Sequence, residues 1–151
     1  MENYIKYFNE IDLINVPEVG GKNASLGEMF QKLISQGVQI PDGFATTSSA
    51  YWYFLEQDDS KQKIFRHLKE LDKVDYTNLT EIGEVIRSII IGIKLPSSIK
   101  QAVKNGYDTL LKKYGPDISL AVRSSATAED LPDASFAGQQ ESYLNVKGID
   151  E

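Results

Sequence analysis

The sequence contains no cysteine, and its single histidine is His67. Without cysteine the chain can form no disulfide, no thiolate metal site and no cysteine nucleophile. Long hydrophobic runs are also missing, because the most apolar stretch, residues 85–95, is interrupted by Arg87 and Lys94. A membrane-spanning helix needs about 20 mostly apolar residues, and the N-terminus has no apolar segment typical of a signal peptide. We therefore expect a cytoplasmic protein with no membrane partner.

Positive charge is scarce as well. Sixteen Lys and Arg residues stand against 22 Asp and Glu, which gives a net charge of −6. The chain has neither a basic tail nor a basic stripe, so nucleic acid is not an expected partner. A nucleotide remains compatible, because one or two well-placed cations are enough to hold a phosphate. With 151 residues, 41% of them hydrophobic, we expect a single domain spanning residues 1–151.

The hydrophobic pattern predicts an α+β fold with several helices and a few short strands. Residues 1–20 look like short extended pieces broken by two glycines. Leu26, Met29, Phe30, Leu33 and Ile34 share one face of a first helix, which begins near Asn23 or Ser25. Further helices are expected at about 48–55, 60–71, 78–93 and 99–114, and strands at 44–47, 120–123 and 143–146. Two strands alone make a marginal sheet, so we expect a truncated domain whose partner strands lie in sequence that is absent.

Residues 19–26 (VGGKNASL) form the first segment that could carry chemistry. Two glycines allow a sharp turn and a close approach to a ligand. Lys22 follows them just ahead of the helix, where free amide groups and the helix dipole favour an anion. Taken alone, the pattern is weak, and a simple turn with a solvated lysine is the better interpretation of it.

Residues 120–146 form the second such segment, two strands joined by a long loop rich in small residues. Arg123 stands at the end of the first strand, where a guanidinium could grip phosphate oxygens. Backbone amides of the loop could also face a triphosphate. The alternative is an ordinary surface loop in which Arg123 pairs with Glu129 or Asp130.

Three motifs in the same order and spacing resemble one family. They are residues 20–29 (GGKNASLGEM), 40–47 (IPDGFATT) and 121–132 (AVRSSATAEDLP). Together they resemble the N-terminal ATP-binding domains of the phosphoenolpyruvate synthase and pyruvate phosphate dikinase family, to which rifampicin phosphotransferase is related. The resemblance covers essentially the whole chain and is weakest across the helices at 58–116.

The resemblance implies the N-terminal part of an ATP-grasp domain that binds Mg-ATP. It implies that Lys22 and Arg123 contact ATP phosphates, with Arg123 also acting in catalysis, and that Gly138 and Ser142 line the nucleotide. The family often has threonine at the last position, so the match at Ser142 is inexact. The resemblance also implies that the Mg²⁺ ligands, the adenine pocket and a phosphohistidine domain lie beyond residue 151.

Two groups of residues have chemistry that suits other roles. His67 lies in a charged amphipathic helix, so we expect an ordinary helix residue and not a phosphoryl carrier. Glu129, Asp130 and Asp133 could bind Mg²⁺ through oxygen atoms, although solvated loop charges are the better interpretation.

Three functions remain open for the chain. The first is an inactive, ATP-binding fragment of a phosphoenolpyruvate synthase, whose pyruvate site is in missing domains. The second is the corresponding part of a rifampicin phosphotransferase, and the third is a short, non-enzymatic nucleotide-binding protein. An exposed strand edge would also make the isolated fragment prone to self-association.

Overall fold

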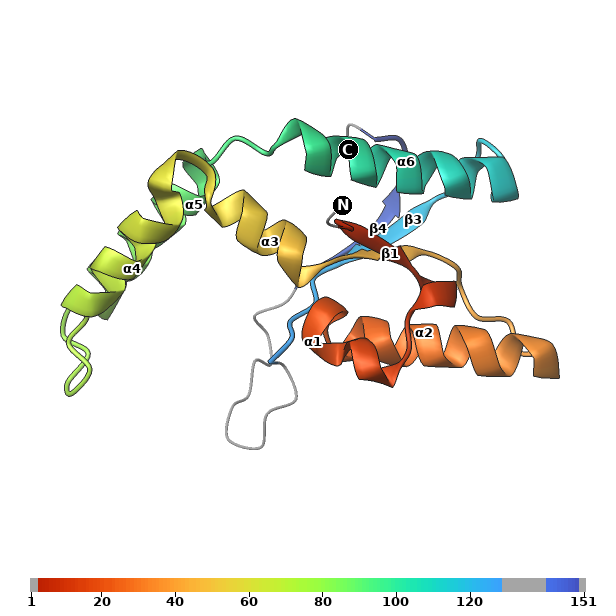
Figure 1. Ribbon diagram of the computed structural model, residues 1–151, viewed down its shortest axis with the longest axis horizontal. Helices are drawn as coiled ribbons and strands as arrows, with labels where there is room; N and C mark the ends of the chain where they lie inside the picture. Colours follow the sequence, from red (N-terminus) through yellow and green to blue (C-terminus); the bar gives the residue numbers. More distant parts are fainter. Residues whose placement is uncertain (1–2, 129–140, 150–151) are drawn as a thin grey trace. The chain divides into compact units, whose positions relative to one another are not determined.

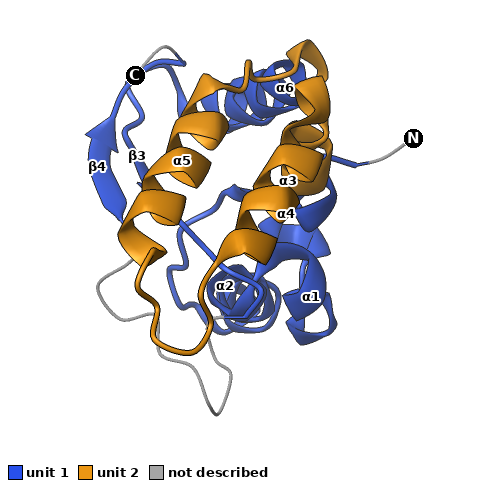
Figure 2. Ribbon diagram, turned by 90° about the vertical axis from the view of Figure 1, so that its left-hand side faces the viewer, with its two compact units in different colours: residues 1–50, 99–151 blue, residues 51–98 orange. Residues whose placement is uncertain are grey.

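A computed structural model describes residues 3–128 and 141–149 (Figure 1). The elements are β1 (Ile5–Tyr7), α1 (Val16–Val19), α2 (Gly21–Leu33), β2 (Phe44–Thr46), α3 (Ser48–Leu55), α4 (Ser60–Glu70), α5 (Leu79–Gly92), α6 (Ser97–Tyr114), β3 (Leu120–Arg123) and β4 (Ser142–Val146). Short 3-10 helices lie at Phe8–Glu10, Leu13–Asn15, Ile34–Gln36 and Gln57–Asp59. The chain divides into two units, residues 1–50 with 99–151 and residues 51–98 (Figure 2). The mixture of helices and small sheets confirms the α+β class.

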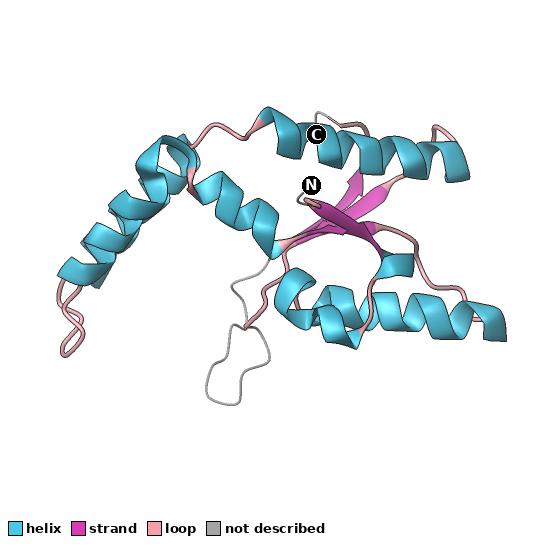
Figure 3. Cartoon of the chain, viewed as in Figure 1, coloured by secondary structure: helices cyan, strands magenta, loops and turns pink. Residues whose placement is uncertain are grey.

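The first unit places its strands between helices, with α6 on one side and α2 on the other (Figure 3). β1 and β2 pair antiparallel, and Tyr7 lies opposite Phe44. The ring of Phe44 packs edge-on against Tyr7, with centroids 6.2 Å apart. It also fills the space beside Gly106 of α6. Aromatic packing of Phe44 therefore holds this sheet against α6.

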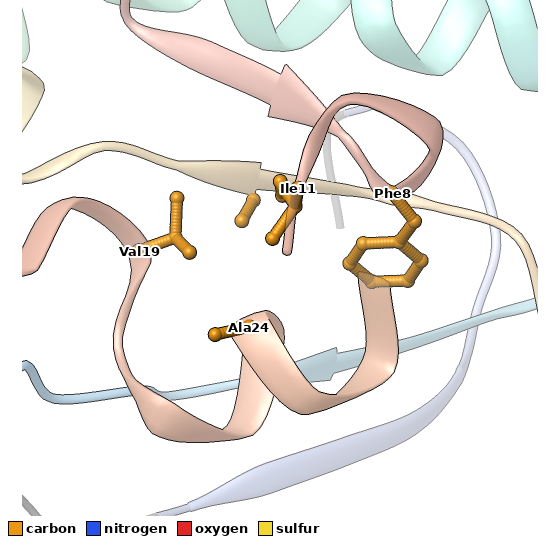
Figure 4. Packing of buried hydrophobic residues seen from close by; sticks show 5 residues of the cluster. Phe8, Ile11, Val19 and Ala24 are labelled. Atoms are coloured by element: carbon orange, nitrogen blue, oxygen red, sulfur yellow. The ribbon is translucent and has the colours of Figure 1, made fainter. Parts of the chain in front are cut away.

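A small hydrophobic core lies between α2 and the segment that follows β1. Figure 4 shows Phe8, Ile11, Val19 and Ala24 pointing into one space. Ile11 is fully buried, and its Cβ lies 2.6 Å from the position that a Cβ on Gly27 would occupy. Gly27 is therefore required for the close approach of α2 to this segment.

Two details of the N-terminal region differ from the sequence prediction. Residues 8–10 and 13–19, expected as extended pieces, form helical turns. The cause is local: Asp12 accepts a hydrogen bond from the amide of Ile14 at 2.9 Å, and Asn15 accepts one from the amide of Asp12 at 3.0 Å. These side chains cap a helical turn that the hydrophobic spacing does not encode.

Helix α2 also buries a different face from the predicted one. Its buried residues are Ala24 and Gly27, whereas Met29 and Ile34 are exposed. Leu26 and Phe30 are partly buried against the core. Small residues face inward because the 3-10 turns around Ile11 approach the helix backbone too closely for larger side chains.

The second sheet of the first unit is the antiparallel β3–β4 hairpin, with an irregularity between Leu120 and Val122. Its side chains are largely exposed, including those of Val122, Tyr143 and Leu144. The hairpin is joined to α6 by a hydrogen bond of 3.1 Å from the amide of Gly148 to the hydroxyl of Tyr107.

The turn before β2 is bound to the end of α6 by an ion pair and a hydrogen bond. Lys113 lies 2.6 Å from the Asp42 carboxylate, and the Tyr114 hydroxyl donates to the same carboxylate at 2.9 Å. Burial alone would raise the pKa of Asp42, but the hydrogen bonds from Lys113, Gly43 and Tyr114 outweigh it and lower that pKa. The carboxylate therefore stays ionised in this contact at neutral pH.

The second unit is built from the antiparallel pair α4 and α5. Leu55, Ile64 and Ile93 form its buried cluster, and Ile86, Ile89 and Ile90 pack against them. Trp52 and Tyr51 are about half exposed. No helix in the described ranges is both long and apolar enough to cross a membrane.

Candidate functional site

Lys22 lies in the first turn of α2, whereas the sequence predicted it just ahead of the helix. Gly20 ends α1 and begins α2 with φ 82° and ψ 159°, a conformation that favours glycine. α2 starts at Gly21, and the Lys22 side chain is exposed. The first amide groups of a helix and its dipole make this end attractive to an anion. A cationic side chain therefore shares one helix end with the amide donors.

Arg123 and Ser142 are direct cross-strand partners at the open end of the β3–β4 hairpin. Arg123 is the last residue of β3 and Ser142 is the first of β4. Residues that lie directly opposite in an antiparallel pair project from the same face, with Cβ atoms about 5 Å apart. Both residues are exposed. Strand pairing thus brings together a guanidinium and a hydroxyl that are distant in sequence.

Ser124 ties the two strands together next to that pair. Its hydroxyl accepts a hydrogen bond from the Glu141 amide at 3.0 Å, and its own amide donates to the Glu141 carbonyl at 3.2 Å. The Glu141 carboxylate accepts from the Tyr143 hydroxyl, a contact that raises the pKa of Tyr143. The carboxylate of Glu141, the residue just before β4, is therefore engaged by a neighbouring hydroxyl.

The segment after β3 lies directly against the junction of α1 and α2. The Ser125 hydroxyl donates to the Val19 carbonyl at 3.1 Å, across 106 positions of sequence. A Cβ on Gly20 would stand 2.7 Å from the Ala126 carbonyl oxygen and would also overlap the Ser125 hydroxyl. The strand end that carries Arg123 and the helix start that carries Lys22 are thus parts of one contact (Figure 1).

Three of the four predicted nucleotide-binding residues therefore sit on two segments that touch: Lys22 on one, and Arg123 with Ser142 on the other. The fourth, Gly138, lies outside the described residues. So do Glu129, Asp130 and Asp133, the carboxylates weighed as Mg²⁺ ligands or as partners of Arg123.

The sequence reading missed three residues of this site. Ser124 and Ser125 belong to the loop that the sequence indicates only as rich in small residues, and Asn23 is indicated only as a possible helix start. Asn23 donates to the Val19 carbonyl at 2.8 Å. Two successive hydroxyls in an extended segment point to opposite sides. Such a pair in a sequence can therefore predict one hydrogen bond to the neighbouring strand and one to a different segment.

Other features of the described residues lie apart from these side chains. One hollow of about 620 Å³ is lined by Glu56 and residues of α4. Another, of about 230 Å³, is lined by β1, the following 3-10 turn, α2, α6 and Asp42. Neither lining includes Lys22, Arg123 or Ser142. Within residues 3–128 and 141–149, no three His, Cys, Asp or Glu side chains gather closely enough to hold a metal ion.

Comparison with known proteins identifies the family of the chain. Residues 16–151 match the family described as the pyruvate phosphate dikinase, AMP/ATP-binding domain. The chain belongs to that family.

Relatives extend the match to almost the full chain. It is 52% identical over 149 residues to a phosphoenolpyruvate synthase of Helicobacter pylori, covering 98% of this chain and 18% of the relative. Identity is 45% over 150 residues to the Neisseria meningitidis phosphoenolpyruvate synthase, covering 99% of this chain and 19% of the relative. It is 46% over 146 residues to the Escherichia coli one, covering 97% and 18%.

These matches confirm the family resemblance that the three motifs indicated. The chain spans about a fifth of the length of the relatives it matches. Residues 16–151 therefore correspond to the AMP/ATP-binding region of such proteins.

Proposed function

We propose that the chain supplies the phosphate-facing half of a Mg-ATP site in a phosphotransferase of the phosphoenolpyruvate synthase type. The observation that carries the proposal is the contact of Ser125 and Ala126 with Val19 and Gly20. Because of it, Lys22 and Arg123 flank a single contact between two segments. The family match to an AMP/ATP-binding domain supports the same ligand.

Each residue of the site has a role that suits a polyphosphate. Lys22 offers a mobile ammonium beside the first amides of α2, whereas Arg123 offers a planar, two-pronged donor for phosphate oxygens. Ser142 can donate one further hydrogen bond from the face it shares with Arg123. Gly138 would let the loop backbone approach the nucleotide. Phosphoryl transfer depends mostly on such positioning and charge neutralisation, so Arg123 is also our candidate for the catalytic cation.

The same proposal includes the larger architecture. We take residues 1–151 to be the N-terminal portion of one ATP-grasp domain, with the other wall of the nucleotide cleft formed by further sequence. The exposed cations fit the phosphates of Mg-ATP, in which the bound Mg²⁺ supplies charge neutralisation between phosphate oxygens. We place the ligands of that ion, the adenine pocket and the pyruvate site in the missing sequence.

The complete enzyme would convert pyruvate, ATP and water to phosphoenolpyruvate, AMP and phosphate in the cytoplasm. A phosphohistidine would carry the phosphoryl group, and we place that histidine outside this chain. His67 is a poor candidate, because it lies on α4 in the second unit with its Nδ1 atom 3.2 Å from the Glu70 carboxylate.

Substitution in the complete enzyme tests the phosphate site. We expect Arg123→Ala and Lys22→Ala each to lower the rate of ATP- and pyruvate-dependent AMP formation by about 100-fold, the effect of removing one donor from a developing charge. The unfolding temperature should not change, because both side chains are exposed. Arg87→Ala and Lys100→Ala, which remove exposed cations of α5 and α6, are the matched controls. Rates within two-fold of the wild type for Arg123→Ala and Lys22→Ala would refute the assignment.

The isolated chain provides a second test. With one wall of the cleft missing, we expect weak or undetectable ATP binding by isothermal titration calorimetry. Tight binding by the 151 residues alone would instead favour a self-sufficient nucleotide-binding protein. Formation of phosphorylated rifampicin by the complete enzyme, without any use of pyruvate, would favour the related phosphotransferase.

A further inference from the structure

The carbonyl of Val19 joins three segments of the first unit. Val19 is the last residue of α1 and is buried. Its carbonyl accepts one hydrogen bond from the Asn23 side-chain amide at 2.8 Å and another from the Ser125 hydroxyl at 3.1 Å. The last carbonyls of a helix have no partner within it. Here the partners come from the first turn of α2 and from the segment after β3.

Both donors stand beside a proposed phosphate-binding cation. Asn23 directly follows Lys22, and Ser125 is two residues beyond Arg123. The contact is also sterically tight, because a Cβ on Gly20 would lie 2.7 Å from the carbonyl oxygen and 3.0 Å from the carbonyl carbon of Ala126. The backbone after β3 thus contacts the α1–α2 junction at Gly20 and is hydrogen-bonded to it at Val19.

We infer that Asn23 and Ser125 are positioning residues that, through their shared acceptor on Val19, hold Lys22 and Arg123 toward one polyphosphate. The inference rests on the proposed function and names two residues that contact the protein, not the nucleotide. Their effect is preorganisation: cations that are already held in place bind a polyanion without the cost of ordering two segments. Without these two hydrogen bonds, part of the binding free energy of the nucleotide would be used to order the two segments.

The shared acceptor gives the two residues a characteristic coupling. Removing one donor leaves the Val19 carbonyl with the other hydrogen bond. Removing both leaves a buried carbonyl without these two partners, and an unsatisfied buried acceptor costs more than the loss of one ordinary hydrogen bond. The effects of the two substitutions should therefore be more than multiplicative.

The experiment uses the complete enzyme and the variants Ser125→Ala, Asn23→Ala and their combination. We expect each single variant to raise the KM for ATP by about 3- to 10-fold, the range of one hydrogen bond. The double variant should raise it by more than the product, and the KM for pyruvate should stay within two-fold in all three. Ser119→Ala, at an exposed serine just before β3, is the matched control and should behave as the wild type.

The unfolding temperature, measured in parallel, separates positioning from general stability. A lower unfolding temperature with an unchanged KM for ATP would show that the Val19 contact is only structural and would overturn the inference. Equal increases in the KM for ATP and for pyruvate would overturn it as well. Asn23→Ala provides the same test from the other side if Ser125→Ala does not fold.

The inference and the proposed function fail in different ways. A wild-type enzyme that does not consume ATP, or an Arg123→Ala variant with normal activity, contradicts the proposed function and the inference together. An enzyme that is impaired by Arg123→Ala but unaffected by Ser125→Ala and Asn23→Ala contradicts the inference alone.

Discussion

Gly106 of α6 is in direct contact with the ring of Phe44 on β2: ring atoms lie 2.8 to 2.9 Å from the position that a Cβ on residue 106 would take. In a helix interior, alanine is about 1 kcal/mol more favourable than glycine. At position 106, however, the added methyl group would clash with a ring that is already packed against Tyr7. Overpacking costs about 1–3 kcal/mol. We therefore expect Gly106→Ala to lower the free energy of unfolding by about 1 kcal/mol, measured by urea denaturation of the chain.

The matched control is Gly92→Ala, at a helical glycine whose added Cβ would meet nothing within 4 Å. Without a clash, the helix preference alone should leave stability equal to the wild type or slightly higher. If Gly106→Ala were as stable as Gly92→Ala, α6 would not pack on β2 as closely as described.

The turn between α4 and α5 should be sensitive to acid. The Asp72 carboxylate accepts hydrogen bonds from the Thr77 hydroxyl at 2.8 Å and from the amides of Val74 and Asp75 at 3.0 and 3.2 Å. The Thr77 hydroxyl and these amides lower the pKa of Asp72 to about 2, against about 3.9 for a free aspartate. A lowered pKa means that this contribution to stability is complete above about pH 4 and is lost as the pH falls toward 2.

Hydrogen exchange followed by mass spectrometry measures how strongly the Asp72 carboxylate protects the amides of this turn. We expect Asp72→Ala to speed exchange at the amides of Val74, Asp75 and Thr77 at neutral pH. The exposed Asp75→Ala variant, whose side chain takes no part in this cluster, is the control. Equal protection in Asp72→Ala and the wild type would show that the carboxylate does not hold the turn.

Ser142 provides a test of the hydroxyl that faces Arg123. Threonine and valine have nearly the same shape, and both suit a strand, but only threonine keeps the hydroxyl. In the complete enzyme we expect Ser142→Thr to retain kcat/KM for ATP and Ser142→Val to lower it by about 10-fold, because a hydrogen bond to a charged group contributes about 1.5–3 kcal/mol. Equal activity of the two variants would remove Ser142 from the nucleotide site.

The β3–β4 hairpin should make the isolated chain self-associate. Tyr143 and Leu144 are 58% and 66% exposed, and Val122 is 47% exposed on the neighbouring strand. Exposed apolar side chains on a two-stranded sheet favour association through its edges or its face. We expect the mass from light scattering to rise with concentration and Leu144→Lys to reduce that rise. Ile91→Lys, at an apolar residue that is 83% exposed on α5, is the control, and a monomer at all concentrations would contradict the expectation.

Local patterns in the sequence were sufficient for the helices and for the family. The spacing of apolar residues predicted α4, α5 and α6 and both strands of the hairpin to within a few residues, because these periodicities arise directly from helix and strand geometry. The three motifs likewise indicated the family that the comparison then showed. The same local reasoning failed at residues 8–10 and 13–19, where polar side chains cap helical turns.

The sequence by itself determined which residue types are available for a phosphate: a lysine after two glycines and an arginine at a strand end. Only the tertiary structure decided that these segments meet, with Ser125 and Asn23 on the Val19 carbonyl and Ala126 against Gly20. The physical reason is that a contact across 106 positions leaves no period in the sequence. It depends on how the helices and strands between them pack, and that packing exists only in the folded chain.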